Sequence, residues 1–193
     1  MIPLWIKPGY TIFVIITIVI YFKKYGPGNF LWFSDIALIA MVPALWLESG
    51  LLASMMAVGI LLPEIFWNIS FFVRLITRKH ISGLTDYMFD SKLPLYLRAL
   101  SLFHIFLPAL VLWMVVKLGY VPTAWFAQTA LAWIVLPLTY LLTDPKENIN
   151  WVRGLSSKPQ KRFPPLVYLC FVMIIFPVVI YLPTHLILKL LFT

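Results

Sequence analysis

Six long apolar segments constrain this chain more than any other feature of its sequence. A helix needs about 20 apolar residues to cross the hydrocarbon core of a bilayer. Hydrophobic residues make up 62% of the chain and charged residues 11%, whereas soluble domains average about 45–50% and 25%. We therefore expect an all-α integral membrane protein, with residues 1–193 as a single polytopic domain, and we exclude a soluble enzyme. The segments are approximately 8–22, 30–47, 51–73, 94–116, 122–143 and 164–188.

Prolines interrupt five of the six segments, which predicts a six-transmembrane-helix bundle with kinked helices. Proline lacks a backbone N–H and so leaves the carbonyl four residues earlier without its helical partner. Pro63 directly precedes Glu64, and Pro108 frees the carbonyl of His104. The segments are continuously apolar and do not alternate as barrel strands do, so a β-barrel is excluded.

The basic residues predict the orientation of the bundle. Six spans place twelve of the fifteen Lys and Arg residues on one side, in loops short enough for the positive-inside rule. We expect a multi-pass protein of the cell (inner) membrane with these loops in the cytoplasm, so both the N-terminus and the C-terminus are extracytoplasmic. The cytoplasmic set comprises Lys23, Lys24, Arg74, Arg78, Lys79, Lys92, Arg98, Lys146, Arg153, Lys158, Lys161 and Arg162, and the outer set comprises Lys7, Lys117 and Lys189.

The net charge of +8 follows from this topology and does not indicate a nucleic-acid partner. Nucleic-acid binding needs basic and aromatic side chains on a soluble surface. Basic residues near a membrane surface instead attract anionic lipid headgroups, by about 1 kcal/mol each. We therefore expect membrane lipids as partners, chiefly at the loop from Arg153 to Arg162, which also contains Lys158 and Lys161.

Three ionisable residues lie deep inside different segments: Asp35, Glu64 and His104. The helical rise places each within about 4 Å of the centre of its segment. A charge at that depth costs at least about 2.5–3.5 kcal/mol, so such groups face the bundle interior and find partners. An imidazole can donate to a carboxylate. We expect the three to converge as a proton-handling or acid–base centre.

A second polar tier lies on the cytoplasmic side of these residues. Asn68 is one turn from Glu64 on the same helix face, and Ser101 and Arg98 share the face of His104. If the faces converge, they form a polar vestibule open to the cytoplasm. Asn68, Ser101 and Arg98 are then candidate substrate contacts.

Two cytoplasmic loops contribute further candidates. Asp86 and Asp90 are four residues apart, a spacing that puts both on one side of a short helix. Asp144 or Thr143 is expected to cap a short helix opening at Pro145, and Asp144, Asn148 or Asn150 could instead form a lid over the vestibule.

Oxygen ligands suit Mg²⁺ or Mn²⁺, so a hard-cation site could use Asp86, Asp90 and Asp144 with Glu147. A single metal held by the deep trio, two carboxylates and one imidazole, is a further alternative. Neither spacing matches a standard motif, so the metal and cofactor content is left open.

Three functions remain open because no nucleotide-binding, hydrolase or zinc-protease motif occurs. The leading hypothesis is proton- or cation-coupled transport of a small solute. The first alternative is an intramembrane enzyme acting on a lipid or isoprenoid substrate. The second is a structural or assembly subunit whose polar residues only fix helix packing.

Overall fold

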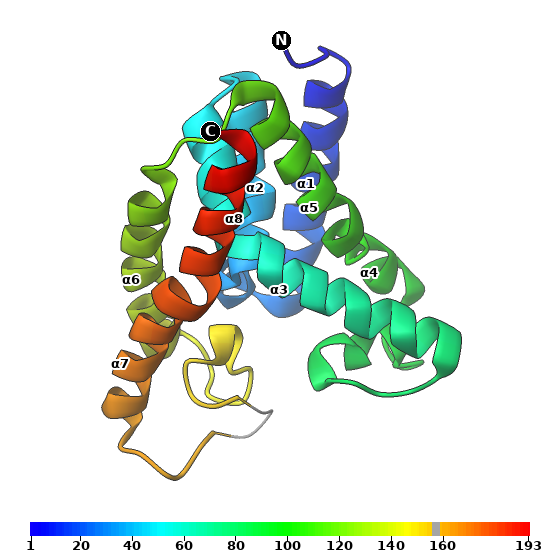
Figure 1. Cartoon of the computed structure of the whole chain (residues 1–193). Helices are drawn as coiled ribbons and strands as arrows, with labels where there is room; N and C mark the ends of the chain where they lie inside the picture. Colours follow the sequence, from blue (N-terminus) through cyan, green and yellow to red (C-terminus); the bar gives the residue numbers. More distant parts are fainter. Residues whose placement is uncertain (156–158) are drawn as a thin grey trace.

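The protein folds into helices joined by turns. In the computed structural model, which describes residues 1–155 and 159–193, no strand occurs within these ranges. Lys158, part of the loop expected to bind headgroups, lies outside the described residues. Figure 1 shows the helices gathered into one bundle, with both chain ends at the same end of it.

Five helical segments are long and apolar enough to cross a membrane, as expected of a multi-pass membrane protein. They match the first, third, fourth, fifth and sixth segments of the sequence analysis. The third continues four residues further than expected. Their bounds are α1 Ile6–Tyr25, α3 Gly50–Thr77, α4–α5 together Leu95–Leu118, α6 Ala124–Leu142, and α7–α8 with the turn between them Pro165–Phe192.

The second segment forms a shorter helix, α2 (Phe33–Trp46), of 14 residues. The expected start at residue 30 is wrong, because Gly26 turns the chain with φ 78° and Pro27–Leu31 form the 3-10 helix η1. The α2 helix is about 21 Å long, less than the roughly 30 Å hydrocarbon core. The turn expected at Glu48–Gly50 is present: Glu48 has φ 49°, and Ser49 caps α3 by accepting from the N–H of Leu52 at 3.3 Å.

The fourth segment is divided into α4 (Leu95–Leu100) and α5 (Phe103–Leu118). At the division, the N–H groups of His104 and Ile105 donate to carbonyls three residues back, at 3.3 and 2.9 Å. Pro108 lies one turn later, and its ring crowds the preceding turn of a helix. The interruption places Ser101 between the two helices and His104 at the start of the second.

The last segment stays continuous but changes its winding. It consists of α7 (Pro165–Ile175), the π-helical turn η4 (Phe176–Tyr181) and α8 (Leu182–Phe192). Pro177 frees the carbonyl of Met173, and the indole Nε1–H of Trp133 on α6 donates to that carbonyl at 3.0 Å. A neighbouring helix therefore satisfies a backbone group that proline leaves open, as membrane helices require.

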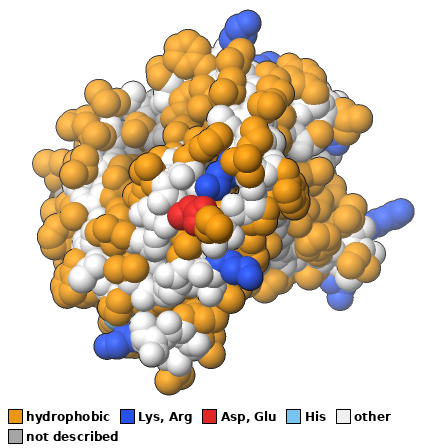
Figure 2. All heavy atoms as spheres, turned by 90° about the horizontal axis from the view of Figure 1, so that it is seen from above, with side chains coloured by type: hydrophobic (Ala, Val, Ile, Leu, Met, Phe, Trp, Pro, Cys, Tyr) orange, Lys and Arg blue, Asp and Glu red, His pale blue; other side chains and the backbone are white. Residues whose placement is uncertain are grey.

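The core lies around α3, which packs against α2, α5, α6 and α8. Large apolar side chains cover the outside of the bundle, among them Ile12, Ile65, Leu141 and Ile174. These exposed apolar side chains suit a lipid environment. Figure 2, which looks onto the end that carries the termini, shows charged side chains scattered among hydrophobic ones.

Two 3-10 helices, η2 (Gly83–Phe89) and η3 (Ile149–Trp151), occupy the loops at the other end. Residues Pro145–Glu147 form a turn, so the helix expected to open at Pro145 is wrong. Asn150 anchors this loop to the α1–α2 connection: its amide donates to the carbonyl of Leu31 at 2.7 Å and accepts from the N–H of Phe33 at 3.2 Å.

Candidate functional site

Glu64 on α3 and His104 on α5 form a buried pair. Nδ1 of the imidazole lies 2.9 and 2.8 Å from the two carboxylate oxygens. The side chain of Glu64 is 4% exposed and that of His104 is 14% exposed. Of the three ionisable residues expected to converge, Glu64 and His104 are in hydrogen-bond contact.

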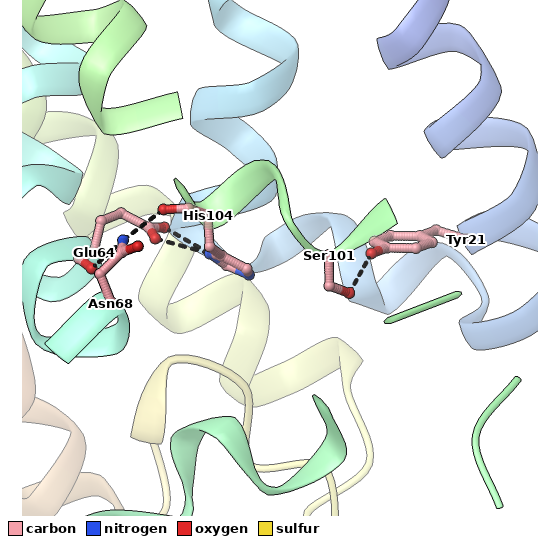
Figure 3. A network of polar contacts seen from close by, with 5 residues as sticks. All are labelled: Tyr21, Glu64, Asn68, Ser101 and His104. Atoms are coloured by element: carbon pink, nitrogen blue, oxygen red, sulfur yellow. Dashed lines mark hydrogen bonds and ion pairs between the residues drawn. The ribbon is translucent and has the colours of Figure 1, made fainter. Parts of the chain in front are cut away.

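Asn68 links the backbones of the two helices that carry the pair (Figure 3). Its amide Nδ2 donates to the carbonyl of Glu64 at 2.8 Å and to the carbonyl of His104 at 2.7 Å. The second carbonyl is the one that Pro108 leaves without a helical donor. The amide therefore fixes the backbone of His104 relative to α3.

Aromatic rings hold the imidazole in place. His104 stacks on Trp67, with ring centroids 4.7 Å apart, and on Phe103, with centroids 4.1 Å apart. Only Nδ1 contacts Glu64, and in Figure 3 the other ring nitrogen points towards the side of Ser101. A carboxylate that orients Nδ1 and leaves Nε2 for another partner is an arrangement that supports acid–base chemistry.

Asp35 lies in the first turn of α2 and is 4% exposed. Its Oδ1 is buried without a hydrogen-bond donor among the residues that the structure describes. Glu64 acts on Asp35 electrostatically, as Asp35 does on Tyr21 and Tyr25. Asp35 thus belongs to the neighbourhood of the Glu64–His104 pair without bonding to it.

Ser101 contacts a residue that sequence reasoning did not select. Its Oγ lies 2.7 Å from the hydroxyl of Tyr21 on α1, and it donates to the carbonyl of Leu97 at 3.1 Å (Figure 3). Tyr21 ends the apolar part of α1 and gave no polar signal in the sequence, because tyrosine is common at membrane interfaces.

The η2 segment supplies a second missed residue, Tyr87. Its hydroxyl lies beside Ser101 and Trp67, and burial raises the pKa of this hydroxyl above its usual range. Met88 packs with Trp67 and Phe71 in a small apolar cluster. The side of the site away from the termini is therefore covered by η2, where the sequence predicted an open vestibule.

Arg98, a predicted substrate contact, instead supports η2. Its Nη1 donates to the carbonyl of Met88 at 3.3 Å, while its Nε is buried without an acceptor among the described residues.

Asp86 and Asp90 do not act together. Asp86 forms ion pairs with Arg74 and with His80, the second at 2.8 Å, whereas Asp90 accepts from the N–H of Lys92 at 2.9 Å. Two residues that are four positions apart do not share a face of a 3-10 helix, because that helix has three residues per turn.

Asp144 and Asn148 organise their own loop. Asp144 accepts from the N–H of Lys146 at 2.8 Å. Asn148 donates to the carbonyl of Gly154 at 2.7 Å and accepts from the N–H of Arg153 at 2.9 Å. These contacts explain both residues as stabilisers of the loop conformation, and not as parts of a lid over the site.

Neither proposed metal site is assembled. Within residues 1–155 and 159–193, no three His, Cys, Asp or Glu side chains lie close enough together to hold a metal ion. The deep trio fails this condition because Asp35 stands apart from the bonded pair. Among the loop carboxylates, Asp86, Asp90 and Asp144 each have separate partners.

An apolar groove of about 610 Å³ lies between α3 and α5, on the outside of the bundle. It is lined from Leu61 to Thr77 on α3 and from Ile105 to Leu112 on α5. Asn68 belongs both to this lining and to the polar contacts of the pair. The groove therefore connects the lipid-facing surface with the neighbourhood of the site.

Comparison of the chain with protein-family models, curated proteins and solved structures finds no match.

Proposed function

We propose that this chain is a proton-coupled membrane carrier of a small solute, with Glu64, His104 and Asp35 as its proton-handling centre. The proposal rests on one observation, the contact of 2.8 Å between His104 Nδ1 and the Glu64 carboxylate inside an apolar bundle. Ionisable groups within membrane spans mark proton and substrate paths more often than they serve packing alone.

The pair can hold a proton in more than one arrangement. An imidazole and a carboxylate can each carry the proton of the hydrogen bond that joins them, so the proton can lie on either partner. Asp35 supplies a second buried acid in electrostatic contact with Glu64. A solute that binds next to these groups would favour one proton arrangement over another, which is the basis of coupling.

Uptake into liposomes under an imposed pH gradient tests the proposal. A panel of radiolabelled sugars, amino acids and monocarboxylates identifies a solute that the wild type accumulates in response to the gradient. Glu64→Gln is expected to abolish gradient-driven accumulation, while Asp90→Asn, which changes an exposed carboxylate outside the site, leaves it intact. Unchanged uptake by Glu64→Gln rejects the proposal. If the wild type takes up none of the solutes and Glu64→Gln only lowers the thermal stability, the results support a structural role instead.

A second candidate function is an intramembrane enzyme acting on a lipid or isoprenoid substrate. Two observations favour it: the ring nitrogen of His104 that faces away from Glu64, and the apolar groove whose lining includes Asn68. His104 would act as a general base oriented by Glu64. Incubation with a membrane lipid extract should yield a product, detected by mass spectrometry, that is absent with His104→Gln. The same lipid profile from both proteins rejects this candidate.

A further inference from the structure

The α3–α5 groove has the dimensions of a lipid-chain site. From Leu61 to Thr77 it follows 17 residues of α3, or about 24 Å along the helix from the first to the last, comparable with most of the hydrocarbon thickness of a bilayer. Its volume of about 610 Å³ falls in the range of small-ligand pockets. Apart from Asn68 and Thr77, its lining is apolar.

Local sequence creates this hollow. Pro108 and Ala109 lie on the α5 side and Ile69 and Phe72 on the α3 side. A proline and an alanine on one wall leave little side-chain bulk to fill the space between the helices. The exposed Ile69 and Phe72 provide an apolar surface along the other wall.

Two basic residues stand at the end of the groove that Thr77 lines. Arg78 ends α3 in the left-handed conformation, φ 61°, and Lys79 follows it. Both are exposed, and neither has a carboxylate partner among the residues that the structure describes. Their neighbours Arg74 and His80 differ, because both are engaged by Asp86.

We infer that the groove holds an acyl chain of an anionic phospholipid whose phosphate is bound by Arg78 and Lys79. Within a bilayer, apolar side chains gain little from one acyl chain rather than another, so the chain fits the groove without selecting the lipid. Selection comes from the headgroup, since each nearby basic residue strengthens binding to anionic lipid by about fivefold. The proposed phosphate contacts, Arg78 and Lys79, lie outside the Glu64–His104 pair, so the inference does not depend on which reaction or transport step that pair performs.

Lipid titration of the detergent-solubilised protein, read by native mass spectrometry, tests the inference. Phosphatidylglycerol is expected to bind more tightly than phosphatidylcholine of the same chain length. The double variant Arg78→Gln/Lys79→Gln should weaken phosphatidylglycerol binding by about 25-fold and remove the preference. The matched control is Lys23→Gln/Lys24→Gln, which removes two exposed charges from the last turn of α1 and should keep the preference for phosphatidylglycerol.

A groove-filling variant tests the other half of the site. Ala109→Trp should reduce the binding of both lipids, whereas Ala130→Trp, at an exposed position on α6, should leave it unchanged. Equal binding of the two lipids by the wild type overturns the inference, and so does an equal loss in the control variants. A second copy of the chain is the other possible occupant of the groove, and light scattering tests for it. If the wild type is a dimer and Ala109→Trp is a monomer, the groove binds a second copy and the inference is overturned.

Discussion

Asn68 shows, at the scale of single residues, how one side chain can replace a backbone hydrogen bond that proline removes. Its amide donates to the freed carbonyl of His104 and to its own helix at Glu64. Asn68→Leu keeps the volume and removes both bonds, so it should lower stability by about 0.6–1.7 kcal/mol, the usual range for such bonds in membrane helices. Thermal unfolding in detergent measures the effect.

The double variant Asn68→Leu/Pro108→Ala separates this role from packing. Alanine at 108 restores an N–H that can donate to the carbonyl of His104, so the cost of Asn68→Leu should shrink in this background. The same cost in both backgrounds would mean that Asn68 stabilises the protein by side-chain packing alone.

Glu48 provides a pH-dependent contact near the chain ends. Its carboxylate accepts from Nζ of Lys7 at 2.9 Å and from the N–H of Ile2 at 3.1 Å, and the hydrogen bond from Lys7 is the main reason that its pKa is lowered. A carboxylate whose pKa is lower in the folded state stabilises that state above its unfolded pKa, and this contribution disappears as pH falls through the folded pKa.

Glu48→Gln should therefore unfold at a lower temperature than the wild type at pH 7, and the difference should shrink as the pH is lowered through the acidic range. Thermal scans of both proteins at a series of pH values measure it. A difference that does not change with pH would show that the carboxylate charge is not responsible.

The candidate site shows which residue properties a sequence reveals. Glu64 and His104 could be identified because charged groups are rare in apolar segments, and Asn68 because it lies one turn from Glu64. Tyr21 and Tyr87 could not, because tyrosine at a span end or in a loop is an ordinary interfacial residue. Their approach to Ser101 depends on how helices and loops pack, which no local pattern encodes.

At the scale of elements, the contact between α3 and α6 leaves no room for an added side-chain atom at Gly59. A Cβ added at Gly59 would lie 2.5 Å from Nε2 and 2.8 Å from Cδ of Gln128, a buried side chain. Gly59→Ala should therefore push the two helices apart or displace the amide, at a cost of about 1–3 kcal/mol. Thermal unfolding again provides the measurement.

Two further variants check this interpretation. Gly9→Ala is the matched control on α1, because a Cβ there meets nothing within 4 Å, and it should be neutral. Gly59→Ala/Gln128→Ala should recover much of the loss by removing the group that clashes. If Gly9→Ala is as harmful as Gly59→Ala, the effect belongs to the helix backbone rather than to the contact.

Helix existence was predictable, while helix interruptions were predictable only in part. Hydropathy located all six apolar segments, but the short η1 before α2 reduced one of them to 14 residues. Proline suggested kinks, yet it did not indicate whether a helix would divide, as before Phe103, or widen into a π-helical turn, as at Phe176–Tyr181. That choice depends on donors from neighbouring helices, such as the indole of Trp133.

Topology, at the scale of the whole molecule, depends on the short helix. Five full-length spans alone would leave the two chain ends on opposite sides of a membrane. Figure 1 shows both chain ends at the same end of the bundle, the arrangement expected if α2 crosses the membrane as a sixth span. The 3-10 turn η1 adds five residues, or up to about 10 Å, to the roughly 21 Å of α2, and together they approach the thickness of the hydrocarbon core.

Cysteine labelling of intact cells tests this arrangement in a Cys170→Ala background. An impermeant maleimide should label Leu4→Cys and Thr193→Cys from outside, and it should label Ser91→Cys and Lys146→Cys only after permeabilisation. The physical reason is the excess of basic residues in the second pair of loops, which keeps them in the cytoplasm. Opposite labelling of the two chain ends would mean that α2 lies in the interface without crossing.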